Sequence, residues 1–309
     1  MSGIELIKVK NEDDGIRLNR WFLKYYPGLG LGRLQKLLRT KQIKVNGKKA
    51  ESATRLEVGD EVRVPPLDNE KTEVVHKEVS AHDIEFINNM VIYKDDKIIV
   101  LNKPSGLAVQ GGTNTLRHID GMLEALKFGN DEKPKLVHRI DKDTSGILVL
   151  ARTRKVAEVL TKAFREKTLQ KTYLALVRGA PKKDFGTIKA PLEKIDGRVQ
   201  IFEGGKHAIT EYEVLDRVSD RYALVAASPL TGRTHQIRAH MEYLGTPIMG
   251  DGKYFGTERE KSNLLANKLH LHAYKIDLSS FYGKTKIIKA KLPDYFRESL
   301  SSLGLNFKE

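Results

Sequence analysis

The chain of 309 residues contains no cysteine. This excludes disulfides, thiolate nucleophiles and cysteine-ligated zinc. No stretch approaches the roughly 18 consecutive apolar residues that a membrane span requires. The first residues, Met1 to Leu6, also lack the charged flank and apolar core of a signal peptide. Together these absences predict a cytoplasmic protein without membrane contact.

The sequence also lacks the patterns that hold common cofactors. It contains no dinucleotide-binding glycine fingerprint, no phosphate-binding loop and no metal-binding cluster. His270 and His272 alternate on a strand-like run, but no carboxylate cluster accompanies them, so we interpret them as structural histidines. We therefore expect chemistry that needs neither a cofactor nor a metal.

Positive charge is abundant and unevenly distributed. Lys and Arg number 54 against 40 Asp and Glu, which gives a net charge of +14. A lysine-rich proteome could explain the excess, but the segment from Gly15 to Ala50 holds ten basic residues and no acidic one. A segment of one sign inside a folded domain favours binding to nucleic acid.

The first 66 residues have the pattern of a small module. Leu18, Trp21, Phe22 and Tyr25 recur at helical spacing, and Leu31 to Leu38 predict a second amphipathic helix. Ile43-Lys44-Val45 leads into Asn46-Gly47, a strong hairpin turn signal, and Pro65-Pro66 closes the unit. We expect the aromatic residues to form the module's core.

This layout, from Ile16 to Val64, resembles the RNA-binding domain first recognised in small-subunit ribosomal protein four. In such domains the basic helix face and the hairpin contact phosphates, so the affinity falls with salt. The residues that we expect to bind RNA are Arg17, Arg20, Arg33, Lys36, Arg39, Lys44 and Lys48.

Residues 67–85 are weakly patterned and are expected to form a linker, with a catalytic domain at 86–309. Strands are predicted at 91–93, 98–101, 146–151, 172–177 and 223–227, and helices at 156–164 and 237–244. Because the helices do not alternate regularly with the strands, the pattern predicts an α+β fold with a mixed, mainly antiparallel central sheet.

The most informative segment is His138-Arg139-Ile140-Asp141-Lys142-Asp143-Thr144-Ser145-Gly146. It lies between apolar Leu136-Val137 and the apolar run Ile147 to Leu150, so its carboxylates are carried to the edge of a buried strand. A carboxylate there needs a cationic or hydrogen-bonding partner, because burying it unpaired is costly. Asp141 could still be a turn cap, and Asp143 fits a bracing role in the loop.

Three further segments mix turn residues with titratable ones: 102–107 (NKPSGL), 171–179 (KTYLALVRG) and 230–240 (LTGRTHQIRAH). Together with 138–146 they closely resemble the pseudouridine synthases of the RluA type. The motif of that family around its catalytic aspartate reads His-Arg-Leu-Asp-x-Asp-Thr-Ser-Gly, and this chain has Ile140 in place of Leu. The resemblance spans essentially the whole chain and includes the order of the segments.

The resemblance implies a role for each matching residue. Asp141 is expected to be the catalytic carboxylate and Arg238 its partner, while Tyr173 stacks against the target uracil and helps to reprotonate carbon five. Arg139 is expected to occupy the space left by a flipped nucleotide. Arg233, His235 and Lys103 are expected to contact substrate, although Lys103 could also simply be solvated.

The resemblance further implies the pseudouridine synthase fold and isomerisation of uridine in RNA. Within the family the chain looks most like the RluC branch, so large-subunit (23S) ribosomal RNA is the expected partner of a monomeric enzyme. Three alternatives remain: an RluD-like enzyme, a transfer-RNA-specific enzyme, and a non-catalytic RNA-binding assembly factor. His138-Arg139 also faintly resembles a kinase catalytic loop, but the aspartate spacing and the missing glycine-rich loop argue against a kinase.

Overall fold

The computed structural model of this protein describes residues 3–67, 79–111, 115, 117–255 and 265–308. The chain forms two compact units, residues 1–78 and 79–309. Most of the segment expected as a linker, residues 68–78, lies outside the described residues. Its remainder includes the first five residues of a helix, α3 (Ala81–Asn88), which begins there because the Ser80 side chain accepts a hydrogen bond from the backbone NH of Asp83.

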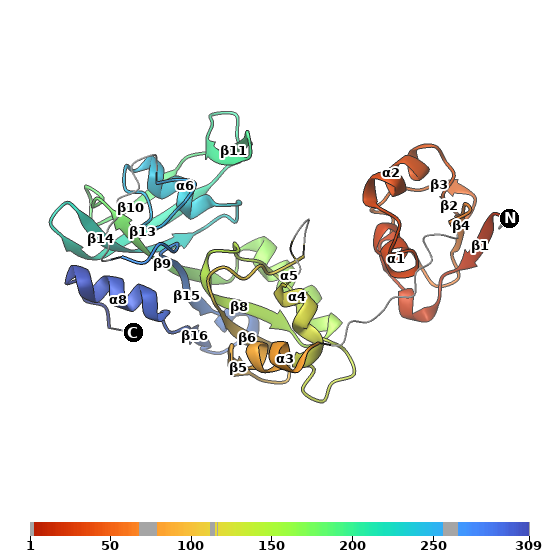
Figure 1. The fold of residues 1–309 in the computed structure, drawn as a ribbon, viewed down its shortest axis with the longest axis horizontal. Coiled ribbons are helices and arrows are strands. Elements are labelled where there is room, and N and C mark those ends of the chain that lie inside the picture. The colour runs from red at the N-terminus through yellow and green to blue at the C-terminus, as the bar shows by residue number, and fades with distance from the viewer. Residues whose placement is uncertain (1–2, 68–78, 112–114, 116, 256–264, 309) are drawn as a thin grey trace. The chain divides into compact units, whose positions relative to one another are not determined.

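The first unit packs two helices against a four-stranded sheet (Figure 1). Its elements are β1 (Glu5–Lys8), a 3-10 helix (Asn11–Asp13), α1 (Leu18–Tyr25), α2 (Leu31–Arg39), β2 (Lys44–Val45), β3 (Lys48–Lys49) and β4 (Glu61–Val64). The predicted hairpin turn is confirmed: Asn46 and Gly47 both have positive φ, at 50° and 72°. Trp21 and Phe22 are buried, as expected of core residues, and Tyr25 packs against the same core.

The second unit is built on a ten-stranded sheet, with β10-β13-β14-β9-β15-β8-β6-β5 as its main order. Among the described strands only β8 and β15 pair in parallel, so the expected mixed, mainly antiparallel α+β fold is confirmed. Its strands are β5 (Val91–Lys94), β6 (Ile98–Lys103), β7 (Lys135–Leu136), β8 (Ser145–Ala151), β9 (Gln170–Arg178), β10 (Phe185–Lys189), β13 (Ile209–Val218), β14 (Tyr222–Pro229), β15 (Leu271–Asp277) and β16 (Ile287–Lys289), with a separate hairpin of β11 (Leu192–Ile195) and β12 (Arg198–Ile201).

Helices cover both faces of this sheet. After α3 come α4 (Ile119–Met122), a 3-10 helix (Leu123–Leu126), α5 (Arg154–Glu166), α6 (Gln236–Tyr243), α7 (Ser279–Tyr282) and α8 (Asp294–Leu303). Successive residues of β9 face opposite sides: Leu174 packs with α8, whereas Ala175 packs with α6. Figure 1 shows α6 and α8 on opposite sides of the sheet. No helix in the described part of the chain combines the length and apolar character that crossing a membrane requires.

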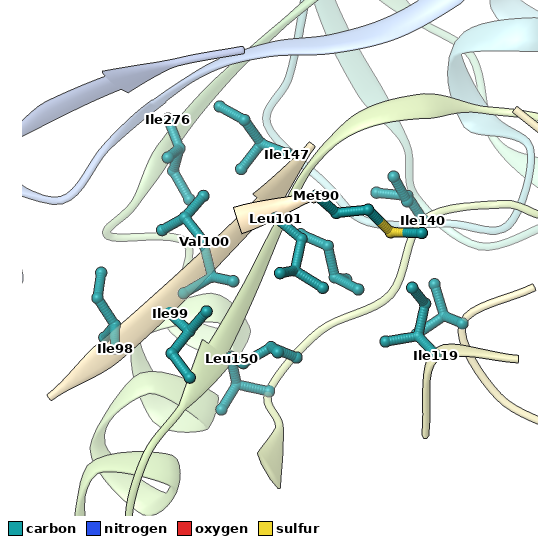
Figure 2. Packing of buried hydrophobic residues seen from close by; sticks show 14 of the residues in the cluster. Met90, Ile98, Ile99, Val100, Leu101, Ile119, Ile140, Ile147, Leu150 and Ile276 are labelled. Atoms are coloured by element: carbon teal, nitrogen blue, oxygen red, sulfur yellow. The ribbon is translucent and has the colours of Figure 1, made fainter. Parts of the chain in front are cut away.

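The strand that follows the polar segment 138–146 is buried along its whole length, from Ser145 to Ala151. Gly146, at φ 102°, lets this strand approach β15, since a Cβ atom there would lie 2.3 Å from the carbonyl oxygen of Ala273. Ile140, next to Asp141, is also buried, and Figure 2 shows it in the same cluster as Met90 and Ile119. The core thus fixes the loop on both sides of Asp141.

Candidate active site

A cavity of about 270 Å³ opens in the second unit, between α5 and α6 and over β9. Six of the predicted site residues line it: Arg139, Asp141, Tyr173, Arg233, His235 and Arg238. They come from segments up to about a hundred residues apart in sequence, so the fold brings most of the predicted site together. The seventh residue, Lys103, lies elsewhere.

Lys103 is fully buried beneath the loop and does not line the cavity. Its Nζ donates hydrogen bonds of 2.8 Å to the carbonyl oxygens of Pro104, Leu107 and Lys142. Burial lowers its pKa to about 7, whereas the nearby carboxylates of Asp143 and Asp141 favour the ammonium form. The expectation that Lys103 contacts substrate or solvent is therefore wrong: its three donors tie together the backbone on which Asp141 sits.

Arg238 is the most strongly fixed cation in the cavity wall. Its Nε and Nη2 donate to the two oxygens of Asp251 at 2.6 and 2.7 Å, and both side chains are buried. Burial acts against the guanidinium charge, but the hydrogen bonds and charge of Asp251 outweigh it and raise the pKa of Arg238. The remaining Nη1 lies 3.7 Å from Oδ2 of Asp141. The predicted pairing is thus a looser contact beside a tight pair that the sequence did not reveal.

His235 contacts the same oxygen of Asp141, with Nε2 3.8 Å from Oδ2. It occupies the position before α6 at φ 52°, a left-handed conformation that is uncommon for a non-glycine residue. Its Nδ1 lies 3.0 Å from the hydroxyl of Tyr254, which also accepts a hydrogen bond from the backbone NH of Val199. The acceptor role of Tyr254 toward Val199 leaves its proton free to bind Nδ1. Burial lowers the pKa of His235, and Asp141 opposes that change.

Tyr173 lies in β9 and lines the cavity together with Asp141. Burial, and secondarily the Asp141 carboxylate, raise the pKa of its phenol well above the usual range. The hydroxyl therefore stays protonated at neutral pH. Arg139 and Arg233 are exposed at the cavity rim, and Arg233 Nε donates to the carbonyl of His207 at 3.1 Å.

Among the cavity residues that were not predicted as site residues, three lie together: His138, Phe164 and Lys171. His138 stacks on Phe164 with ring centroids 4.2 Å apart, and Lys171 Nζ lies 5.9 Å from the same ring. A signal for Lys171 was present, because residues 171 and 173 of one strand face the same side.

The two structural histidines are deeply buried and hydrogen-bonded. His272 Nδ1 lies 2.8 Å from Ser145 Oγ and its Nε2 lies 3.1 Å from the carbonyl oxygen of Ala290, while His270 Nε2 lies 2.8 Å from Ser299 Oγ. Burial lowers the pKa of each imidazole to about 4. Within the described residues no group of three His, Cys, Asp or Glu side chains could hold a metal ion.

In the first unit, the predicted RNA-binding residues lie largely at the surface. Arg33, Lys36 and Arg39 are exposed on α2, whereas Leu34, Leu37 and Leu38 of that helix are buried. Of the other predicted residues, Arg17, Arg20 and Lys48 are also exposed. Lys44 is half-buried.

Comparison with known proteins gives consistent results. Residues 97–243 match the family model described as RNA pseudouridylate synthase. A Rickettsia bellii protein named "Ribosomal large subunit pseudouridine synthase C" is 39% identical and covers 94% of this chain and 99% of its own length. An Escherichia coli O157:H7 protein of the same name is 34% identical over 97% of each chain. The solved structure "Human RNA Pseudouridylate Synthase Domain Containing 4" superposes with a TM-score of 0.62 at 28% identity, covering 73% of this chain and 97% of that one.

Proposed function

Because the chain belongs to the RNA pseudouridine synthase family, we propose that it isomerises uridines of large-subunit ribosomal RNA, with Asp141 as the catalytic carboxylate. The names and nearly full-length match of the Rickettsia and Escherichia relatives support this substrate. The observation that carries the catalytic role is the position of Asp141. Its carboxylate is held at the cavity, 3.7 Å from Arg238 and 3.8 Å from His235.

The reaction breaks the bond between N1 of uracil and the anomeric carbon of the ribose. The detached base turns and rejoins the sugar through carbon five. An ionised Asp141 serves either as a nucleophile on the anomeric carbon or as a base at the neighbouring carbon of the sugar. Arg238 places a permanent positive charge 3.7 Å from this carboxylate in both routes, since a guanidinium does not lose its proton.

The proton balance changes the role expected for Tyr173. Isomerisation removes a proton from carbon five and leaves one on N1, so the step at carbon five is a deprotonation and not a reprotonation. A phenol with a raised pKa must first pass its own proton on before it accepts another. We therefore assign Tyr173 to stacking against the uracil, with any proton transfer through its hydroxyl coupled to a second group.

The target base must leave its helix to reach this cavity, which costs a few kcal/mol of unstacking. Stacking on Tyr173 offsets part of that cost, and we assign exposed Arg139 to the space that the base vacates. The exposed cations of α2 and of the β2–β3 hairpin supply the grip on phosphates, which makes residues 1–66 the RNA-binding module of the proposal.

The test uses purified protein and unmodified transcripts of large-subunit ribosomal RNA and transfer RNA, with pseudouridine mapped by carbodiimide labelling and primer extension. We expect stops at specific uridines of the ribosomal transcript. Stops confined to transfer RNA would replace the proposed substrate with the transfer-RNA alternative. Binding without any product would favour a non-catalytic assembly factor.

A further inference from the structure

His138, Phe164 and Lys171 form one wall of the cavity for which the proposed mechanism has no role. Phe164 comes from α5, Lys171 from β9 and His138 from the loop before β8, so three separate elements build it. His138 and Lys171 meet at the Phe164 ring, at centroid distances of 4.2 and 5.9 Å. The imidazole and the ammonium group thus both lie close to the ring of Phe164.

His138 presents a single hydrogen-bond donor that the protein leaves unused. The backbone NH of Val149 donates to its Nε2 at 2.8 Å, so the proton of the neutral ring resides on Nδ1. Burial and the Lys171 charge lower the pKa of this histidine to about 3, and the ring is neutral at physiological pH. Among the described residues no acceptor contacts Nδ1.

Lys171 is a cation without an anion. In the part of the chain that the structure describes, no carboxylate and no hydrogen-bond acceptor contacts its Nζ. Burial, with the charge of Lys167 nearby, lowers its pKa. A partly buried ammonium without a partner is unfavourable, and a second cation beside it adds to the cost. The wall is therefore prepared for an anionic ligand rather than for a neutral one.

We propose that Lys171 and His138 form a phosphate-binding subsite that holds a phosphodiester group adjoining the target uridine. This inference rests on the proposed function. Lys171 and Tyr173 lie two positions apart on one face of β9, roughly 7 Å along the strand. A base stacked on Tyr173 thus has its own backbone within reach of Lys171. The ammonium supplies charge, and His138 Nδ1–H supplies a directed hydrogen bond.

The experiment is a double-mutant cycle between protein and RNA. The probes are synthetic oligonucleotides that carry a uridine mapped as a product site. One has an ordinary backbone, and the others have a neutral methylphosphonate on the 5′ or the 3′ side of that uridine. For the wild-type protein we expect one of the two analogues to lower kcat/KM about tenfold, as the loss of a charge-assisted hydrogen bond would.

Lys171→Met should lower kcat/KM for the ordinary oligonucleotide by a similar factor. With this variant, the analogue to which the wild type is sensitive should give the same kcat/KM as the ordinary oligonucleotide. Lys171→Arg keeps the charge and should restore sensitivity to it. His138→Met has no hydrogen-bond donor to offer, so it should also reduce the effect of the analogue.

The subsite would be excluded if the losses of kcat/KM from Lys171→Met and from the methylphosphonate multiplied. It would also be excluded if both analogues left kcat/KM of the wild-type protein unchanged. Lys171 would then only pack against Phe164. The wild-type result does not depend on whether a variant folds. If the wild-type protein forms no pseudouridine in the ribosomal RNA transcript from which the product site is mapped, the proposed function fails instead, so the two failures are distinguishable.

Discussion

Arg238 donates two hydrogen bonds to buried Asp251 from Nε and Nη2, while its third guanidinium nitrogen, Nη1, lies 3.7 Å from Asp141. The bidentate pair fixes the guanidinium plane, and the free edge is thereby aimed at the candidate catalytic carboxylate. Asp251 also accepts backbone hydrogen bonds from Lys253 and Tyr254, so the orientation is set by a turn as well as by a charge. Asp251 thus orients Arg238, and Arg238 lies beside Asp141, the proposed catalytic residue.

Replacing Asp251 tests this arrangement. Asp251→Asn removes the charge that compensates a buried guanidinium, so the free energy of unfolding should fall by about 3 kcal/mol and the rate of isomerisation should fall with it. Urea unfolding and single-turnover kinetics measure the two effects. The matched control is Asp294→Asn, which removes an exposed ion pair with Arg297 and should cost less than about 1 kcal/mol. Equal effects of the two variants would contradict the positioning role.

Lys103 should matter for stability and not for RNA affinity. Lys103→Met removes a donor from three carbonyl oxygens, of which that of Lys142 keeps a hydrogen bond from the backbone NH of Gly106. We expect the change to cost about 3 kcal/mol of unfolding free energy. The affinity for RNA, measured by filter binding below the unfolding temperature, should be unchanged because the ammonium is inaccessible. Lys142→Met, which alters an exposed lysine of the same loop, should be nearly neutral in stability. A Lys103→Met protein with native stability and weakened binding would restore the substrate-contact expectation.

The basic face of α2 should control the salt dependence of RNA binding. The triple change Arg33→Gln, Lys36→Gln, Arg39→Gln should lower the slope of log affinity against log salt by about 2 to 3, since each lost phosphate contact removes roughly 0.7 to 0.9. Electrophoretic mobility shifts over a range of salt concentrations measure the slope. Lys8→Gln with Lys10→Gln, outside the basic segment, should leave it unchanged. An unaltered slope for the triple variant would exclude this helix face from RNA binding.

Buried histidines should make the second unit sensitive to acid. The pKa of His272 is about 4 in the folded protein, below the value of about 6.5 expected in the unfolded chain. The unfolded chain thus binds more protons between these values. The contribution of His272 is complete above about pH 6.5 and is lost as the pH falls toward 4, by about 3 kcal/mol. Urea unfolding at several pH values should show that His272→Gln has a shallower loss than the wild type. Parallel curves would mean that His272 does not titrate with unfolding.

Much of the fold was predictable because its signals are local. The Asn46-Gly47 turn, the apolar run of β8 and the helical spacing of α1 and α2 each occupy a few neighbouring residues. Strands β10 to β13 were not predicted, since their residues mix polar and apolar types without strict alternation. These residues form strands because they pair with neighbouring strands, and that pairing is not visible in the local sequence.

Only those site residues that belong to a recognisable sequence motif were predictable. Asp141, Tyr173 and Arg238 do line one cavity, and the resemblance had grouped them. The Arg238–Asp251 pair was missed because Asp251 lies in an ordinary Gly-Asp-Gly turn, and nothing local marks it as buried. Lys103 was misassigned for the same physical reason: whether a lysine faces phosphate or carbonyl oxygens depends on the loop folded over it. The inferred role of Lys171 depends on its having no anionic partner among the described residues, which the sequence does not show.

The account depends most directly on Asp141. The decisive measurement compares wild-type protein with Asp141→Asn on the same large-subunit ribosomal RNA transcript, recording pseudouridine formation and RNA affinity together. Asparagine has nearly the same shape but neither the charge nor the nucleophilicity of the carboxylate. We predict that product formation is abolished while the dissociation constant changes by no more than about twofold, because most of the affinity comes from phosphate contacts elsewhere. Product formed by Asp141→Asn at the wild-type rate would contradict the central claim.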